Sequence, residues 1–295
     1  MIYTFDLNFM NRPGAIASYL IPHADGAILI ESGPGSTTAA LQANLKAHGL
    51  RVEAISDVFL THIHLDHAGA AGWLARQGAR IHVHPVGASH MLDPEKLLAS
   101  AARIYGDSME SLWGEFLPVP EQSLSILQDG EDVIVNGLRL QAVETPGHAE
   151  HHFVYLFEDI CFSGDIGGVR LSGTHHIRLP MPPPEFHLDK WRQSLYRLEA
   201  LDITHIAPTH FGVFSDKDWH LRTLKKTLNE TEAWIEATMP ADPPIEVINQ
   251  QLITWSKNRA RQDGVPDVQI EGYESANPSW MSGYGIQRYW RKFRQ

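Results

Sequence analysis

The chain has 295 residues, of which 43% are hydrophobic and 20% are charged. That balance is typical of a soluble globular protein and excludes a fibrous or disordered one. The formal net charge of -11 disfavours nucleic acid as a partner, and no apolar run approaches the ~18 residues of a membrane helix. A single cysteine, Cys161, fits a reducing compartment, so we expect a cytoplasmic protein.

Strands and helices alternate along the chain. The patterns predict, in order, strands at 2–6, 15–22 and 26–31, a helix at 36–48, a strand at 54–60, a helix at 66–77, a strand at 81–84, further strands between 124 and 163, a helix at 188–200, a strand at 203–207, and helices at 216–237 and 245–261. Residues 85–117 carry apolar side chains at mixed helical spacing, which could wall an apolar substrate pocket, although core packing is the commoner use.

This alternation predicts an α/β sandwich, with two sheets covered by helices on their outer faces. A proline-rich hinge at 240–244 divides a catalytic domain, 1–239, from a C-terminal helical extension, 240–295. The extension ends in a basic and aromatic tail, Arg288 to Arg294. We expect the tail to pack on the body of the protein, and it could also dock on a partner subunit to form a homodimer.

The most informative segment is Thr61-His-Ile-His-Leu-Asp-His67, where a buried strand ends and a helix begins. His62 and His64 are two residues apart, so on extended backbone they point the same way and can share an ion. Asp66 and His67 follow the turn and can face a second ion. Imidazole and carboxylate groups are ligands that suit zinc, iron and similar metals.

Three further fragments end other strands beside Gly or Pro. His148 follows Thr-Pro-Gly and can join His62 and His64. Asp165 follows Ser-Gly and can place one oxygen on each ion, and His210 follows Pro-Thr and completes the second ion's set. Ligands at the ends of several strands indicate one site along one edge of the sandwich.

In this order, these residues resemble those of the metallo-β-lactamase superfamily, and closely its glyoxalase II-like branch. The resemblance covers about residues 1–235 and implies an αββα fold. It also implies two divalent metal ions, with zinc expected first and iron or manganese as alternatives. The ligand sets that it implies are His62, His64 and His148 on metal one, Asp66, His67 and His210 on metal two, and Asp165 as the bridge.

The chemistry that we expect is attack of a metal-bound hydroxide on a small-molecule ester, thioester or lactone, with Asp66 orienting the nucleophile. The alternative is a mononuclear iron oxygenase similar to the persulfide dioxygenases of the same superfamily. A complete second ligand set argues against it. A β-lactamase proper, a tRNA-processing nuclease, a flavodiiron protein and a non-catalytic metal module are less well supported.

Two other features are candidates for supporting roles. His176 and Arg178 lie in the loop after Asp165 and are expected to contact the substrate. Glu31 precedes Ser-Gly, where it could orient the metal-binding loop, and a helix cap or turn residue is an equally open interpretation.

Overall fold

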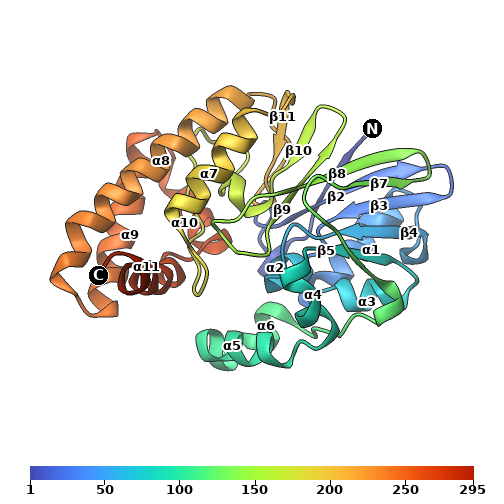
Figure 1. Ribbon diagram of the computed structural model, residues 1–295, viewed down its shortest axis with the longest axis horizontal. Coiled ribbons are helices and arrows are strands. Elements are labelled where there is room, and N and C mark those ends of the chain that lie inside the picture. Colours follow the sequence, from blue (N-terminus) through green and yellow to red (C-terminus); the bar gives the residue numbers. More distant parts are fainter.

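Two β-sheets pack face to face at the centre of the molecule, with helices on both outer sides (Figure 1). This computed structural model describes all residues, 1–295. The first sheet has the order β1-β2-β3-β4-β5-β6, with strands Tyr3–Asp6, Ala17–His23, Gly26–Ile30, Ile55–Phe59, Arg80–Val83 and Leu124–Ile126. The second has the order β11-β10-β9-β8-β7, with β7 to β11 at Asp132–Val135, Leu138–Glu144, Phe153–Phe157, Ile160–Phe162 and His205–Ala207. The expected αββα fold class is confirmed.

Strand direction decides where the chain's loops gather. β3 and β4 run parallel, so the segments after Ile30 and Phe59 leave the first sheet at the same edge. In the second sheet β10 and β11 run parallel, and β8 is antiparallel to β9, which is antiparallel to β10. The carboxyl ends of β8, β10 and β11 therefore also share one edge, as a site built from strand ends requires.

The helices have the following bounds: α1 Thr38–Ala47, α2 Leu65–Ala68, α3 Ala71–Arg76, α4 Pro85–Leu92, α5 Glu95–Tyr105, α6 Met109–Trp113, α7 Leu188–Glu199, α8 Lys217–Thr238, α9 Ile245–Gln262, α10 Asp267–Ala276 and α11 Ser279–Phe293. The helix predicted at 66–77 is broken into α2 and α3. The break arises because the Ala70 amide donates to the Gly33 carbonyl, and the His67 carbonyl accepts from the amides of Ser32 and Gly33. The loop after β3 thus replaces one turn of helix.

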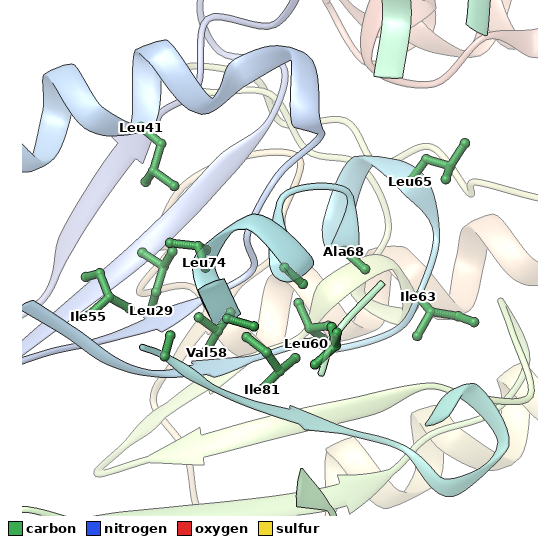
Figure 2. Close-up of a cluster of buried hydrophobic side chains, with 14 of the residues drawn as sticks. Leu29, Leu41, Ile55, Val58, Leu60, Ile63, Leu65, Ala68, Leu74 and Ile81 are labelled. Atoms are coloured by element: carbon green, nitrogen blue, oxygen red, sulfur yellow. The ribbon is translucent and has the colours of Figure 1, made fainter. Parts of the chain in front are cut away.

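Alternation along the strands of the first sheet divides its side chains between two cores. Leu29 and Val58 face outward and pack with Leu41 of α1 and Leu74 of α3 (Figure 2). The neighbouring Phe59 faces inward and packs against the second sheet. Each large side chain buried in this way stabilises the fold by ~1.5–3 kcal/mol.

The C-terminal helices pack on the outer layer of the second sheet. Ile248 and Leu252 of α9 and Ile286 of α11 are buried in the same cluster as Leu224 and Leu228 of α8. The predicted hinge at 240–244 coincides with the break between α8 and α9, and the tail forms part of α11, with Tyr289 buried. None of the helices combines the length and apolar character needed to span a membrane. The division into two domains stays a prediction.

Candidate metal centre

Three histidines converge where β4 and β8 end. His62 and His64 follow β4, and His148 follows β8. Nδ1 of His64 lies 2.9 Å from Nε2 of His62 and 2.9 Å from Nε2 of His148. The three nitrogen atoms lie within 4.8 Å of one another, as expected for the ligands of one ion.

A second group forms beside the first, at the start of α2 and after β11. Oδ2 of Asp66 lies 3.6 Å from Nε2 of His67 and 3.4 Å from Nε2 of His210. Because Asp66 and His67 stand in the first turn of a short helix, they face a different point from His62 and His64. These three side chains also form a group whose donor atoms could hold one ion.

Asp165, in the short 3-10 helix Gly164–Gly167 that follows β10, stands between the two groups. Its Oδ1 lies 3.5 Å from Nε2 of His67 and 3.4 Å from Nε2 of His210. Its Oδ2 lies 3.2 Å from Nε2 of His148. The structure thus brings together all seven of the side chains singled out in the sequence, with one carboxylate oxygen of Asp165 facing each group.

Hydrogen bonds to the second ring nitrogen fix the direction of these histidines. Nδ1 of His148 donates to the Pro180 carbonyl over 2.9 Å, and Nδ1 of His210 donates to the Ala15 carbonyl over 2.7 Å. With Nδ1 protonated, Nε2 carries a free lone pair directed at the centre. Such partners orient the histidine ligands of metal sites.

Glu31 is a buried carboxylate that hydrogen-bonds to several residues around the two groups. Its carboxylate accepts hydrogen bonds from Nδ1 of His67 at 2.9 Å, from the Thr209 hydroxyl at 3.0 Å and from the Thr61 amide at 3.2 Å. The Thr61 hydroxyl also donates to Glu31 and can accept from Nδ1 of His62 at 3.0 Å. Glu31 therefore connects both groups and the turn before His210, and of the two interpretations left open the orienting one fits this geometry.

The residues present fit a pair of divalent cations. Nε2 of His67 and Oδ1 of Asp165 are buried without any hydrogen-bond partner, although they face each other. A buried polar atom without a partner is costly, and a cation between such atoms would satisfy both. Glu31 could also be grouped with His62 and His67 as ligands, but its oxygens are already occupied by hydrogen-bond donors.

The pKa shifts of the buried side chains also favour bound cations at this centre. Burial lowers the pKa of His62 well below its usual value and the pKa of His64 to about 3, so both rings stay neutral at neutral pH. Burial also acts to lower the pKa of His67, but the surrounding carboxylates outweigh it and raise that pKa well above its usual value. The buried carboxylates thus attract positive charge, which metal ions would supply.

A cavity of about 550 Å³ opens over the centre. Five of the seven side chains reach its wall: His64, Asp66, His148, Asp165 and His210. The rest of the wall is largely apolar and comes from α5, α6, the proline run and the start of α11; it includes Leu97, Ile104, Leu112, Trp113, Pro183, Trp280 and Met281. Part of the apolar set at 85–117 thus walls a pocket, whereas Met91 and Phe116 pack in the core.

His176 and Arg178 do not line this cavity, which differs from the expected substrate contact. Both are buried beneath the C-terminal extension. Nδ1 of His176 pairs with Asp263 at 2.7 Å, and the Arg178 guanidinium pairs with Glu274 at 2.7 Å. The loop after Asp165 therefore anchors the extension, and the residues that the sequence failed to indicate are those of the extension itself, including Trp280 and Met281.

The fold and the site define a class of αββα proteins with a histidine and aspartate centre at one sheet edge. The metallo-beta-lactamase superfamily profile matches residues 11–210, and the chain belongs to that superfamily. The fold of this family implies that the chain binds divalent metal, and its carboxylate and imidazole groups are present at the centre.

Relatives with named activities are distant. The chain is 27% identical to the metallo-beta-lactamase fold-containing protein ST1585 of Sulfurisphaera tokodaii, over 62% of this chain and 70% of that one. It is 29% identical to a hydroxyacylglutathione hydrolase of Aeromonas hydrophila, over 85% of this chain and 74% of the relative. It is 25% identical to an atrochrysone carboxyl ACP thioesterase of Aspergillus fumigatus over 85% of its length, and the match spans 48% of that protein.

Among solved structures, the metallo-beta-lactamase family protein TTHA1429 of Thermus thermophilus superposes with a TM-score of 0.66 at 22% identity. The match covers 99% of this chain and 93% of that one, so it includes the C-terminal helices. At this identity the likeness supports the fold alone.

Proposed function

We propose that the chain is a binuclear metal-dependent hydrolase that cleaves a thioester, or a related ester or lactone, with an apolar acyl group. The observation that carries this proposal is the pair of ligand groups that share Asp165 and open on a largely apolar cavity. In this assignment His62, His64 and His148 would hold one ion, Asp66, His67 and His210 would hold the other, and Asp165 would be shared between them.

When bound, two divalent ions would supply Lewis acidity, lowering the pKa of water and polarising the scissile carbonyl. The chain's own residues arrange the rest. Burial acts to raise the pKa of Asp66, but His67 and His210 outweigh it and lower that pKa to about 2, so the carboxylate is ionised. Asp66 lines the cavity, and its second oxygen can accept a hydrogen bond from the attacking water, which orients that water toward the substrate.

The cavity supports an apolar acyl group as the part of the substrate held inside. Its walls bring apolar side chains from α5, α6 and α11 to within reach of the centre, and they outnumber the charged side chains of the wall, which are Arg12, Lys96, Glu185 and Glu274. A largely apolar wall removes part of the acyl chain from water and favours burial of hydrocarbon. The thioesterase and hydroxyacylglutathione hydrolase relatives also favour acyl transfer to water.

The alternative of a mononuclear iron oxygenase is less well supported by the geometry. Such an enzyme would use only His62, His148 and Asp165 as a facial triad. Here the second group is formed to the same degree, and Glu31 is committed to holding His67 in place. Because Glu31 bonds Thr61 beside His62 as well as His67, it supports both groups, which favours a binuclear centre.

The experiment is a metal count combined with a substrate panel. The protein is purified without chelators, its metals are measured by mass spectrometry, and hydrolysis of acyl N-acetylcysteamine thioesters, lactones and phosphoesters is followed. We expect about two ions per chain and turnover of thioesters that rises with acyl length. One iron per chain, together with oxygen consumption on persulfide and no hydrolysis, would replace this proposal with the oxygenase.

A further inference from the structure

We propose that the thiol half of the substrate is a phosphorylated carrier of the coenzyme A type, bound by a basic groove beside the cavity. This inference rests on the proposed function and names its substrate class. The basic groove is a concavity of about 940 Å³ between α5, the proline run and α11; it is lined by Arg103, Ile104, Pro183, Trp280, Tyr284, Gln287, Arg288, Arg291 and Lys292.

The charge of the basic groove is the first observation. Its lining includes four cationic side chains and no acidic one, in a chain whose formal net charge is -11. Arg103 and Lys292 are exposed and have no ion-pair partner, and Arg291 makes one exposed ion pair, with Asp242 at 3.2 Å. Unneutralised cations concentrated in one concavity attract a polyanion and fit phosphate groups well.

The guanidinium of Arg288 is fixed at one end and has free hydrogen-bond donors for an anion at the other. Its Nε donates to the Pro184 carbonyl over 3.1 Å, which leaves the terminal nitrogens of the guanidinium without a protein partner. A guanidinium fixed at one end and free at the other loses less conformational freedom when it binds a phosphate bidentately.

Continuity with the cavity is the second observation. Ile104, Pro183 and Trp280 line both the basic groove and the cavity over the metal centre. We call these three side chains the neck: they border both hollows, with the cations of the basic groove on one side and the largely apolar cavity on the other. A linear molecule with an anionic end, a neutral arm and an apolar end matches this sequence of environments.

Thioesters of coenzyme A have that order of groups. The phosphates would lie in the basic groove, the neutral pantetheine arm would pass the neck, and the acyl group would enter the cavity. Hydrolysis consumes one water: its oxygen bonds to the acyl carbon, and the carbon–sulfur bond breaks with its electron pair on sulfur. The sulfur leaves as the free thiol and the acid leaves ionised, with one proton released to solvent.

The test compares two thioesters of the same acid on the metal-loaded protein. Octanoyl-CoA carries the phosphates, and octanoyl-N-acetylcysteamine lacks them. In the double variant Arg103→Gln/Lys292→Gln we expect KM for octanoyl-CoA to rise about tenfold with kcat within about twofold, and no change for the phosphate-free thioester. Calorimetric binding of free CoA should weaken by a similar factor, independently of turnover.

A matched control removes one lysine charge and one arginine charge away from the basic groove. Lys46 on α1 and Arg76 on α3 are also exposed and without ion-pair partners, and they lie on the helical layer over the first sheet (Figure 1). The double variant Lys46→Gln/Arg76→Gln should behave as wild type with both thioesters.

Each other outcome has a definite meaning. Unchanged KM and unchanged CoA binding in the groove variant would overturn the inference while leaving the proposed function intact. Impairment with octanoyl-loaded carrier protein but not with octanoyl-CoA would also overturn it, since the groove would then dock a protein. If wild type cleaves neither thioester nor the lactones of the panel, the proposed function fails, and if it cleaves only lactones, this inference fails alone; in both cases CoA calorimetry decides whether the groove binds this anion.

Discussion

The ligand edge and the far wall of the cavity are built in different ways. The ligand edge comprises the seven proposed metal ligands, and buried partners such as Glu31, Pro180 and Ala15 fix its histidines. The far wall comprises α5, α6 and residues 274–281. It closes through few contacts, among them the Tyr105 hydroxyl 2.9 Å from the Met281 sulfur.

We expect the ligand edge to carry the reaction and the far wall to determine which substrate is accepted. Ligands must keep their positions closely for two metals to be held, and a shell of buried hydrogen bonds provides that rigidity. The far wall only has to match the shape and polarity of a substrate, so apolar contacts between segments distant in sequence suffice. Substitutions at the edge should therefore change whether the reaction occurs, and substitutions at the wall should change which substrate reacts.

The largest effect is expected from the ligand edge itself. Asp66→Ala removes a proposed ligand of the second ion and the group that orients water, and His62→Ala removes a ligand of the first. Either change should reduce kcat/KM by ~10³-fold or more while the circular dichroism spectrum stays that of wild type. Near-normal activity in a variant that has lost metal, as measured by mass spectrometry, would contradict the assignment.

A smaller effect, on metal affinity, is expected at Glu31, which holds the ligand His67 in place. Glu31→Gln keeps the side-chain volume but turns one acceptor oxygen into a donor that faces Thr61, Thr209 and His67. Metal affinity should fall about 10–100-fold, measured by competition with a chromophoric chelator.

A control for this variant uses another buried carboxylate and histidine pair in the same sheet. Asp57 accepts from Nε2 of His82 over 2.7 Å, away from the centre. Asp57→Asn should lower the melting temperature without changing metal affinity. If both variants lose metal equally, general destabilisation rather than the position of Glu31 would account for the loss.

The ligand edge could be predicted from the sequence to a greater extent than the far wall. The ligands could be predicted because they stand at strand ends, where residue type and spacing directly express geometry. Glu31 could be only half predicted, since its partner Thr209 is far along the chain and the hydrogen bond needs the folded sandwich.

The far wall could not be predicted from local patterns. His176 and Arg178 were expected at the substrate because loops after a ligand often overhang metals, but Nδ1 of His176 hydrogen-bonds to Asp263 and the Arg178 guanidinium pairs with Glu274, both in the extension. Nothing in the spacing of the tail indicates that Trp280 approaches Tyr105, with ring centroids 5.9 Å apart. Contacts between segments so far apart depend on how α9 to α11 fold back.

A moderate effect on selectivity is expected at the wall. Trp280→Ala removes apolar surface from the cavity and from the neck, so long acyl groups should lose more than short ones. The ratio of kcat/KM for octanoyl over acetyl N-acetylcysteamine thioester should fall about tenfold. Tyr284→Ala serves as the control, because Tyr284 lines the basic groove but not the cavity, and its ratio should stay unchanged.

The smallest effect is expected on stability, at an ion pair beneath the turn that carries His210. The Arg170 guanidinium pairs with both oxygens of Asp216 at 2.6 and 2.7 Å, and the Arg170 amide donates to the His210 carbonyl. The hydrogen bonds from Arg170 lower the pKa of Asp216. Asp216→Asn should cost about 1–2 kcal/mol at neutral pH, a figure kept low because the Asp216 side chain is 35% exposed and partly screened.

The sign of the pH dependence follows from that lowered pKa. The stabilisation by an ionised Asp216 is fully present above the unfolded-state pKa, about 3.9, and is lost as the pH falls through the lower folded-state pKa. Urea unfolding of both proteins after metal removal should therefore show a constant difference from neutral pH down to about pH 5, and a narrowing one below about pH 4. A difference that grows on acidification would mean that the neighbouring His220, whose Nδ1 lies 3.4 Å from Arg170, controls this turn instead.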